Sequence, residues 1–118
     1  MIEAKHIGLC KARHDIMTND GEEVTDFFFE KIESPHDYKH LESMAWCKFI
    51  NIGNYDECMR RMPERVYLYV TGLTMALTSV LKIYESKKYR FRQDMKLSLM
   101  HFDRESNTYK EQVWEVEK

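Results

Sequence analysis

Three groups of polar residues in this sequence are suited to holding an anionic ligand. Each group follows a short apolar run, where an α/β chain usually turns and exposes its side chains. The residues are Lys11, Arg13, His14, Thr71, Gly72, Thr74, His101, Asp103 and Arg104. Arginine and lysine bind phosphate, threonine hydroxyls and backbone N–H groups hold oxyanions, histidine transfers protons, and aspartate can bind a ribose hydroxyl. This combination suits a nucleotide better than an acyl substrate.

Most of these residues also have a structural explanation. Arg13 and His14 can form surface pairs with the acidic segment 20–23, which cost little and bind nothing. Thr71 can cap the helix that follows it. A histidine on a strand, such as His101, often makes only a structural hydrogen bond. Both interpretations stay open for each residue.

The second group lies in a predicted strand, turn and helix. Val66–Val70 is rich in β-branched and aromatic residues, which is typical of a central strand buried on both faces of a parallel sheet. Thr71 and Gly72 interrupt this run, and apolar residues then recur at helical spacing from Leu73. The start of that helix would present free N–H groups and a positive dipole end to a ligand.

The topology of such a fold should bring the three groups together. A strand–helix–strand unit is right-handed with parallel strands, so Val66–Val70 and a strand over Lys96–Phe102 should end at the same edge of the sheet. If a first strand over His6–Cys10 runs parallel to these two, Lys11 and its neighbours reach that edge as well. Ligands of open α/β sheets bind outside the carboxyl ends of the strands.

The segment between the first two predicted strands has turn residues and acids but no hydrophobic period. We therefore expect residues 15–25 to form an exposed loop. Asp26–Ile32 is predicted to be the second strand, antiparallel to the first. Its three phenylalanines indicate burial on both faces, or a hydrophobic face that a second subunit covers. Together with the open edges of a small sheet, they predict a homodimer.

A helix is predicted to begin at Ser34 and Pro35, which suit the N-cap and the first helical position, and to end at Gly53. A short helical turn should follow over residues 54–61. The basic run Lys87–Arg92 suits a helix C-terminus, and a nucleic-acid patch is the less favoured alternative.

A terminal hairpin is predicted from strands over residues 96–102 and 108–116. No repeat or linker divides the 118 residues, so a single domain is expected. The predicted class is α/β: a small Rossmann-like mixed sheet of about five strands, with two main helices and a C-terminal β-hairpin.

Composition limits the partners that the chain can have. The net charge of −2 gives no general attraction to nucleic acid or to anionic membranes. The three cysteines have no CxxC spacing, so neither a disulfide framework nor a zinc site is indicated, and a reducing cytoplasm is expected. His36 and His40 lack a third ligand for a metal. No apolar run approaches membrane-spanning length, so we expect a cytoplasmic protein without metal, cofactor or membrane contact.

Residues Tyr69–Thr74, followed by Ala76 and Leu77, resemble the strand–turn–helix that opens the ligand site in CRISPR-associated Rossmann-like domains and related small ring nucleases. In size and layout the chain is also similar to phage-encoded proteins that bind or sequester nucleotide immune signals. The resemblance covers about a sixth of the chain, and such turns recur in many α/β folds. It implies a cyclic or adenine-type nucleotide ligand, a role in host defence or anti-defence, and a homodimer.

The favoured function is a non-enzymatic nucleotide-binding protein, a sensor or a sponge for a signal. In this hypothesis the turn Thr71–Thr74 holds a phosphate, while Lys11, Arg13 and Arg104 neutralise its charge.

Two other functions compete with it. A metal-independent phosphodiesterase would use His14 or His101 as general acid or base, although no nucleophile is evident beside them. A protein-interaction module or inhibitor would instead use a surface such as Phe27–Phe29 or the acidic loop, and would need no small-molecule ligand.

Overall fold

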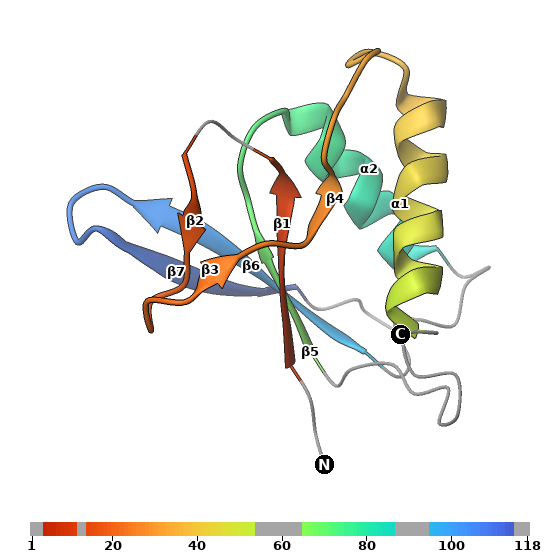
Figure 1. Ribbon diagram of the computed structural model, residues 1–118. Coiled ribbons are helices and arrows are strands. Elements are labelled where there is room, and N and C mark those ends of the chain that lie inside the picture. The colour runs from red at the N-terminus through yellow and green to blue at the C-terminus, as the bar shows by residue number, and fades with distance from the viewer. Residues whose placement is uncertain (1–3, 12–13, 54–64, 87–94, 115–118) are drawn as a thin grey trace.

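The computed structural model describes residues 4–11, 14–53, 65–86 and 95–114 (Figure 1). Four parts of the sequence predictions lie outside these ranges. They are Arg13, the short helical turn over residues 54–61, the basic run Lys87–Arg92 and residues 115–116 of the last predicted strand.

The core of the fold is a five-stranded mixed sheet with the strand order β4-β1-β5-β6-β7. These strands are β1 (Ala4–Cys10), β4 (Phe27–Phe29), β5 (Arg65–Tyr69), β6 (Lys96–Asp103) and β7 (Thr108–Trp114). The first four strands of that order are parallel, and β7 pairs antiparallel with β6. The predicted α/β class, the two main helices and the C-terminal hairpin are therefore confirmed.

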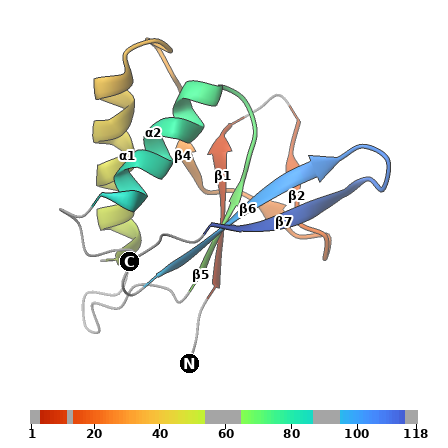
Figure 2. The ribbon, with the colours of Figure 1, turned by 180° about the vertical axis from the view of Figure 1, so that it is seen from behind.

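Two helices cover one face of this sheet. α1 (Tyr38–Gly53) connects β4 to β5, and α2 (Thr74–Glu85) connects β5 to β6. Both connections advance in the same direction across the sheet, and right-handed connections that advance in one direction lie on one face. Figures 1 and 2 show the two helices side by side, and they pack against each other.

The connection from β1 to β4 goes the opposite way across the sheet, and a right-handed connection in that direction belongs on the opposite face. It contains a small antiparallel hairpin of β2 (Ile16–Met17) and β3 (Glu23–Val24). The predicted exposed loop over residues 15–25 is thus wrong in part. Ile16 and Val24 are buried against Tyr69 and Met100, so this segment forms a second, smaller core.

The direction of β4 also differs from the prediction. Phe27–Phe29 pairs parallel with β1, with Gly8 opposite Phe27 and Cys10 opposite Phe29. The sequence predicts antiparallel pairing because this is the simplest arrangement for two strands joined by one loop. The β2–β3 hairpin supplies an additional reversal of the chain, and this reversal makes the pairing parallel.

The first helix begins later than predicted. Ser34–Asp37 forms a turn in which the Asp37 N–H donates to the Ser34 carbonyl at 3.1 Å. The N–H of His40 then donates to the Asp37 carboxylate at 3.2 Å, so Asp37 has the N-capping role. A proline suits the second position of a turn as well as the start of a helix, which explains the error. His36 therefore lies outside the helix, and its spacing from His40 is not a helical pair.

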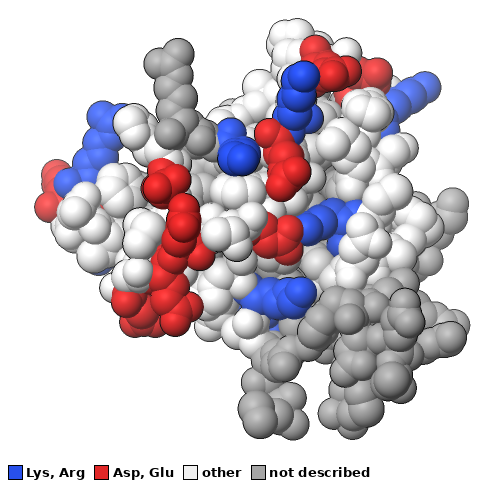
Figure 3. Space-filling view, viewed as in Figure 1, with Lys and Arg blue, Asp and Glu red and all other residues white. Residues whose placement is uncertain are grey.

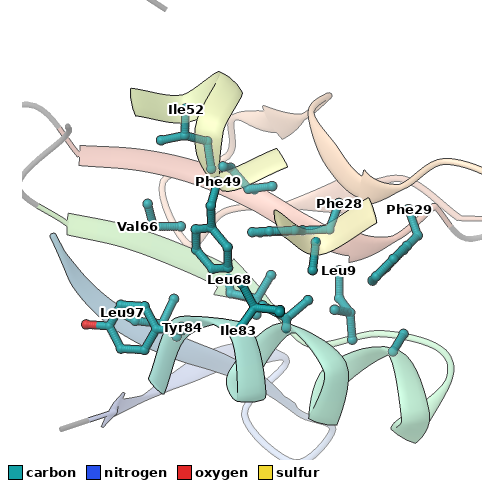
Figure 4. Close-up of a cluster of buried hydrophobic side chains, with 14 of the residues drawn as sticks. Leu9, Phe28, Phe29, Phe49, Ile52, Val66, Leu68, Ile83, Tyr84 and Leu97 are labelled. Atoms are coloured by element: carbon teal, nitrogen blue, oxygen red, sulfur yellow. The ribbon is translucent and has the colours of Figure 1, made fainter. Parts of the chain in front are cut away.

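The main hydrophobic core lies between the sheet and the two helices (Figure 4). Phe28 and Phe29 point into it and are 5% and 1% exposed, so neither offers a hydrophobic face to a second subunit. The ring of Phe28 meets Phe49 of α1 edge to face, with 5.1 Å between ring centroids. The α2 residues buried here are Ala76, Ser79, Val80, Ile83 and Tyr84. The apolar residues at helical spacing from Leu73 lie on this side of α2: Val80 and Tyr84 are buried, and Leu73, Leu77 and Leu81 are partly buried against the same core.

The opposite face of β5 is only partly covered, which corrects the prediction of burial on both faces. Arg65 and Tyr67 are half-buried there. Tyr69 is buried against the β2–β3 hairpin, and Tyr67 packs against the same small cluster. The Arg65 guanidinium donates to the Ser98 hydroxyl at 2.6 Å, and this hydroxyl donates to the Glu111 carboxylate at 2.6 Å. A polar network therefore links β5, β6 and β7 on a part of the sheet that no described helix or hairpin covers.

Candidate functional site

The carboxyl ends of β1 and β5 lie next to each other at one edge of the sheet. The two strands are parallel neighbours, as the composite site requires. After β1 the chain continues to β4, the neighbour on one side within the sheet. After β5 it continues to β6, the neighbour on the other side. Adjacent parallel strands whose connections diverge form the switch point at which open α/β sheets commonly bind ligands.

Thr71, Gly72 and Cys10 join these two strand ends. The Thr71 hydroxyl donates to the Cys10 carbonyl at 2.8 Å, and the Cys10 N–H donates to the same hydroxyl at 3.4 Å. Gly72 has a φ of +80°, and a Cβ at this position would lie 2.9 Å from the Cβ of Cys10. Burial raises the pKa of the Cys10 thiol, which keeps it protonated as a packing group. Thr71 and Gly72 therefore hold the turn in place.

The start of α2 retains donors for an anion. Its N-cap is Leu73, whose side chain cannot accept a hydrogen bond. The N–H groups of Ala76 and Leu77 donate to the Leu73 carbonyl, at 3.1 and 3.3 Å. The preceding N–H groups, those of Thr74 and Met75, have no acceptor within the helix because of their position in its first turn. Thr74 and Gly72 are exposed, so a ligand can reach this turn.

Basic residues follow the neighbouring strand. Lys11 comes directly after Cys10 and is exposed, while its backbone N–H donates to the Phe29 carbonyl at 3.0 Å. His14 is exposed as well. The structure therefore places the backbone of Lys11 beside the strand end that Thr71 contacts, and its side chain remains in solvent.

The third predicted group begins beside β5, because Met100 pairs with Tyr69 and accepts a hydrogen bond from the Val70 N–H, and it continues outward along the β6–β7 hairpin. Figures 1 and 2 show the β6–β7 hairpin extending sideways past β2, away from the start of α2. His101 Nε2 lies 2.8 Å from the Gln112 side-chain oxygen. Asp103 accepts hydrogen bonds from the Ser106 hydroxyl at 2.9 Å and the Glu105 N–H at 3.1 Å, which lower its pKa. These two residues shape the hairpin, and the exposed Arg104 belongs to the same turn.

The surface charge is mixed. Figure 3 shows acidic and basic side chains interspersed, with acidic ones gathered over the β2–β3 hairpin, where Asp20, Glu22 and Glu23 are exposed. Among the described residues, no three His, Cys, Asp or Glu side chains are placed to hold a metal ion. No described helix is long and apolar enough to cross a membrane.

Sequence reasoning missed one polar contact that shapes this end of the molecule. Asn19, in the β2–β3 turn, donates from its side-chain nitrogen to the Tyr109 carbonyl at 3.0 Å and accepts from the Tyr109 N–H at 2.9 Å. Its amide thereby pairs with β7 as a neighbouring strand would. Asn19-Asp20-Gly21 signals a turn in the sequence, but nothing local indicates a partner 90 residues away.

Comparison with models of protein families, with curated protein sequences and with solved structures finds no match for this chain. The structure and the chemistry of its residues therefore carry the functional interpretation.

Proposed function

We propose that this protein binds a small phosphate-bearing ligand at the start of α2 and does not cleave it. The observation that carries the proposal is the uncapped first turn of α2, with Gly72 and Thr74 exposed, at the switch point between β1 and β5. Free N–H groups and the positive dipole end of a helix of this length favour a phosphate there.

Each residue of the site has a separate role in this proposal. The N–H groups of Thr74 and Met75 donate to the phosphate, and the Lys11 ammonium neutralises its charge. Thr71 and Gly72 keep the turn open and attached to β1 through their contacts with Cys10. His14 is a further donor.

The proposal assigns no role to the β6–β7 hairpin. His101 is within hydrogen-bond distance of Gln112, and Asp103 bonds within its own turn. A binding role therefore suits this chain better than a phosphodiesterase that depends on His101. A cyclic or adenine-type nucleotide is the ligand class to test first, because the resemblance of residues 69–77 implies it.

Substitution of Thr74 separates the backbone contact from the side chain. Thr74→Pro removes the N–H and the hydroxyl but leaves the helix intact, because proline suits the first helical position. Leu73 has φ −77° and ψ 128°, the extended conformation that a residue before proline prefers. Thr74→Ala, the matched control, removes the hydroxyl and keeps the N–H.

The assay is a thermal shift titration with inorganic phosphate, ATP, cyclic dinucleotides and cyclic oligoadenylates. Wild-type protein and Thr74→Ala should be stabilised by the same nucleotide, and Thr74→Pro should bind it roughly tenfold or more weakly because a hydrogen bond to a charged group is lost. Lys11→Glu should also weaken binding of this nucleotide, because it replaces the ammonium that neutralises the phosphate with a carboxylate. Lys96→Glu, at the amino end of β6, should leave nucleotide binding unchanged.

Two results would refute the proposal. One is the absence of a shift with every ligand, which would favour a protein partner as the target. The other is equal binding by Thr74→Pro and Thr74→Ala, which would place the ligand elsewhere. Conversion of a bound nucleotide to products would refute the statement that the ligand is not cleaved and would support the enzymatic alternative.

A further inference from the structure

The main sheet has two edges of unequal length. β4 has only three residues, whereas β7 has seven and continues to Trp114. Short edge strands are protected from pairing with other chains, and long ones are not unless charge, proline or a covering segment blocks them. The outer edge of β7 is therefore the edge better suited to pairing with a strand of another chain.

Hydrogen bonding on the inner side of β7 determines which of its residues face outward. The Val70 N–H donates to the Met100 carbonyl, so the backbone groups of Met100 face β5. The backbone groups of successive residues in a strand face alternate sides, and Leu99 and His101 therefore face β7. Leu99 pairs with Gln112 and His101 pairs with Lys110, so the backbone groups of these two β7 residues face β6. The backbone groups of the β7 residues between and beside them face outward. These are Tyr109, Glu111 and Val113.

One of the three outward positions is already occupied. The Asn19 side chain accepts from the Tyr109 N–H and donates to the Tyr109 carbonyl, which also confirms the outward direction. Glu111 and Val113 are exposed, and no described residue pairs with their outward backbone groups. Within the described part of the chain, the edge therefore offers unpaired backbone at Glu111 and Val113, limited at one end by Asn19.

We infer that this stretch pairs antiparallel with the same stretch of a second copy of the chain. A twofold axis beside Gln112 places Glu111 of each copy opposite Val113 of the other, and each such pair exchanges two backbone hydrogen bonds. The two sheets then form one continuous sheet with their helices on the same side.

Charge and the Asn19 contact favour this register over the one centred on Glu111. A twofold axis at Glu111 would place two carboxylates opposite each other and would bring Val113 against Tyr109, which Asn19 already occupies. In the inferred register Glu111 faces an apolar side chain. Its own carboxylate is held on the sheet by the Ser98 hydroxyl, and the Arg65 guanidinium lies 3.9 Å from it.

The side chains on the helix side are complementary as well. Lys110 and Trp114 alternate with Glu111 and Val113, so they lie on the face that carries the helices. The inferred register places Lys110 of each copy opposite Trp114 of the other, where an ammonium can contact an indole ring. A second copy therefore suits this edge in backbone, charge and side-chain type.

The test is the molar mass in solution, measured by light scattering and sedimentation from micromolar to near-millimolar protein. Wild-type protein should rise from the monomer mass of 14.3 kDa toward twice that value. Val113→Glu places a carboxylate opposite Glu111 of the second copy in both pairs, so the dissociation constant should rise about 2–30-fold. Val113→Lys, which replaces the same exposed side chain, should lower the constant. Circular dichroism confirms that both variants are folded.

Cross-linking tests the register directly. Gln112→Cys, in a variant with serine at Cys47 and Cys58, should oxidise to a disulfide dimer because the two residues lie beside the axis. Lys110→Cys in the same background should not. A monomer at every concentration would overturn the inference. A dimer that both Val113 variants leave unchanged, or one cross-linked equally by Lys110→Cys, would also overturn it, as would a foreign peptide strand that binds this edge in a monomeric protein.

Discussion

Alanine at Gly72 should destabilise the protein through two separable effects. The φ of +80° costs an L-residue about 1–2 kcal/mol. The new Cβ would also lie 2.9 Å from the Cβ and 3.2 Å from the Sγ of the buried Cys10. Forcing an atom into a packed site costs about 1–3 kcal/mol. The free energy of unfolding of Gly72→Ala should therefore fall by about 2–5 kcal/mol, the sum of these two effects.

Two other glycines provide matched controls for this substitution. Gly21 has a φ of +87°, and a Cβ added there would meet no atom of the described residues within 4 Å, so Gly21→Ala should show only the backbone cost of about 1–2 kcal/mol. Gly8 has no positive φ, but its Cβ would lie 2.5 Å from the Phe27 ring, so Gly8→Ala should show only the packing cost of about 1–3 kcal/mol. The loss of backbone entropy in the unfolded chain is common to all three variants.

Urea unfolding followed by tryptophan fluorescence measures these differences. The slope of the unfolding free energy against urea concentration should be the same for all variants, because none of them changes the surface exposed on unfolding. The reasoning fails if Gly72→Ala and Gly21→Ala lose the same free energy to within about 0.5 kcal/mol, since the close approach of Cys10 would then contribute nothing.

Three further predictions concern the core, a helix cap and the pH dependence of stability. Phe49→Ala should lower the free energy of unfolding by about 3–5 kcal/mol in urea titrations, because the ring is fully buried. Asp37→Ala should cost about 0.5–2 kcal/mol in the same assay and Ser34→Ala almost nothing, and the reverse order would restore Ser34 as the N-cap. Burial raises the pKa of Tyr69 from 10.0 to about 12, so its contribution to stability is full below pH 10 and is lost as the pH rises toward 12. Urea titrations from pH 8 to 11.5 should therefore show a smaller alkaline loss for Tyr69→Phe than for wild-type protein.

Local patterns in the sequence determined most of the elements. The apolar run at Val66–Val70, the break at Gly72 and the helical spacing after it correctly predict β5, its turn and α2. The terminal hairpin was equally readable. In each case the signal arises from residues within one or two turns of one another, because side-chain periodicity depends on the local backbone geometry alone.

The convergence of the first two polar groups was also predictable. It needs only the right-handed connection between parallel strands and a parallel first strand. The structure places Lys11, Thr71 and Thr74 on adjacent strand ends or the turn that follows them.

Only the tertiary structure decided the direction of β4 and the roles of the polar residues. The direction depended on a hairpin whose residues become buried only against strands distant in sequence. Thr71 holds Cys10 across 61 residues, and Asn19 holds Tyr109 across 90. The choice between a ligand contact and a structural bond therefore depended on which distant backbone group came within hydrogen-bond distance. Chain closure and handedness determine this, and neither leaves a local pattern in the sequence.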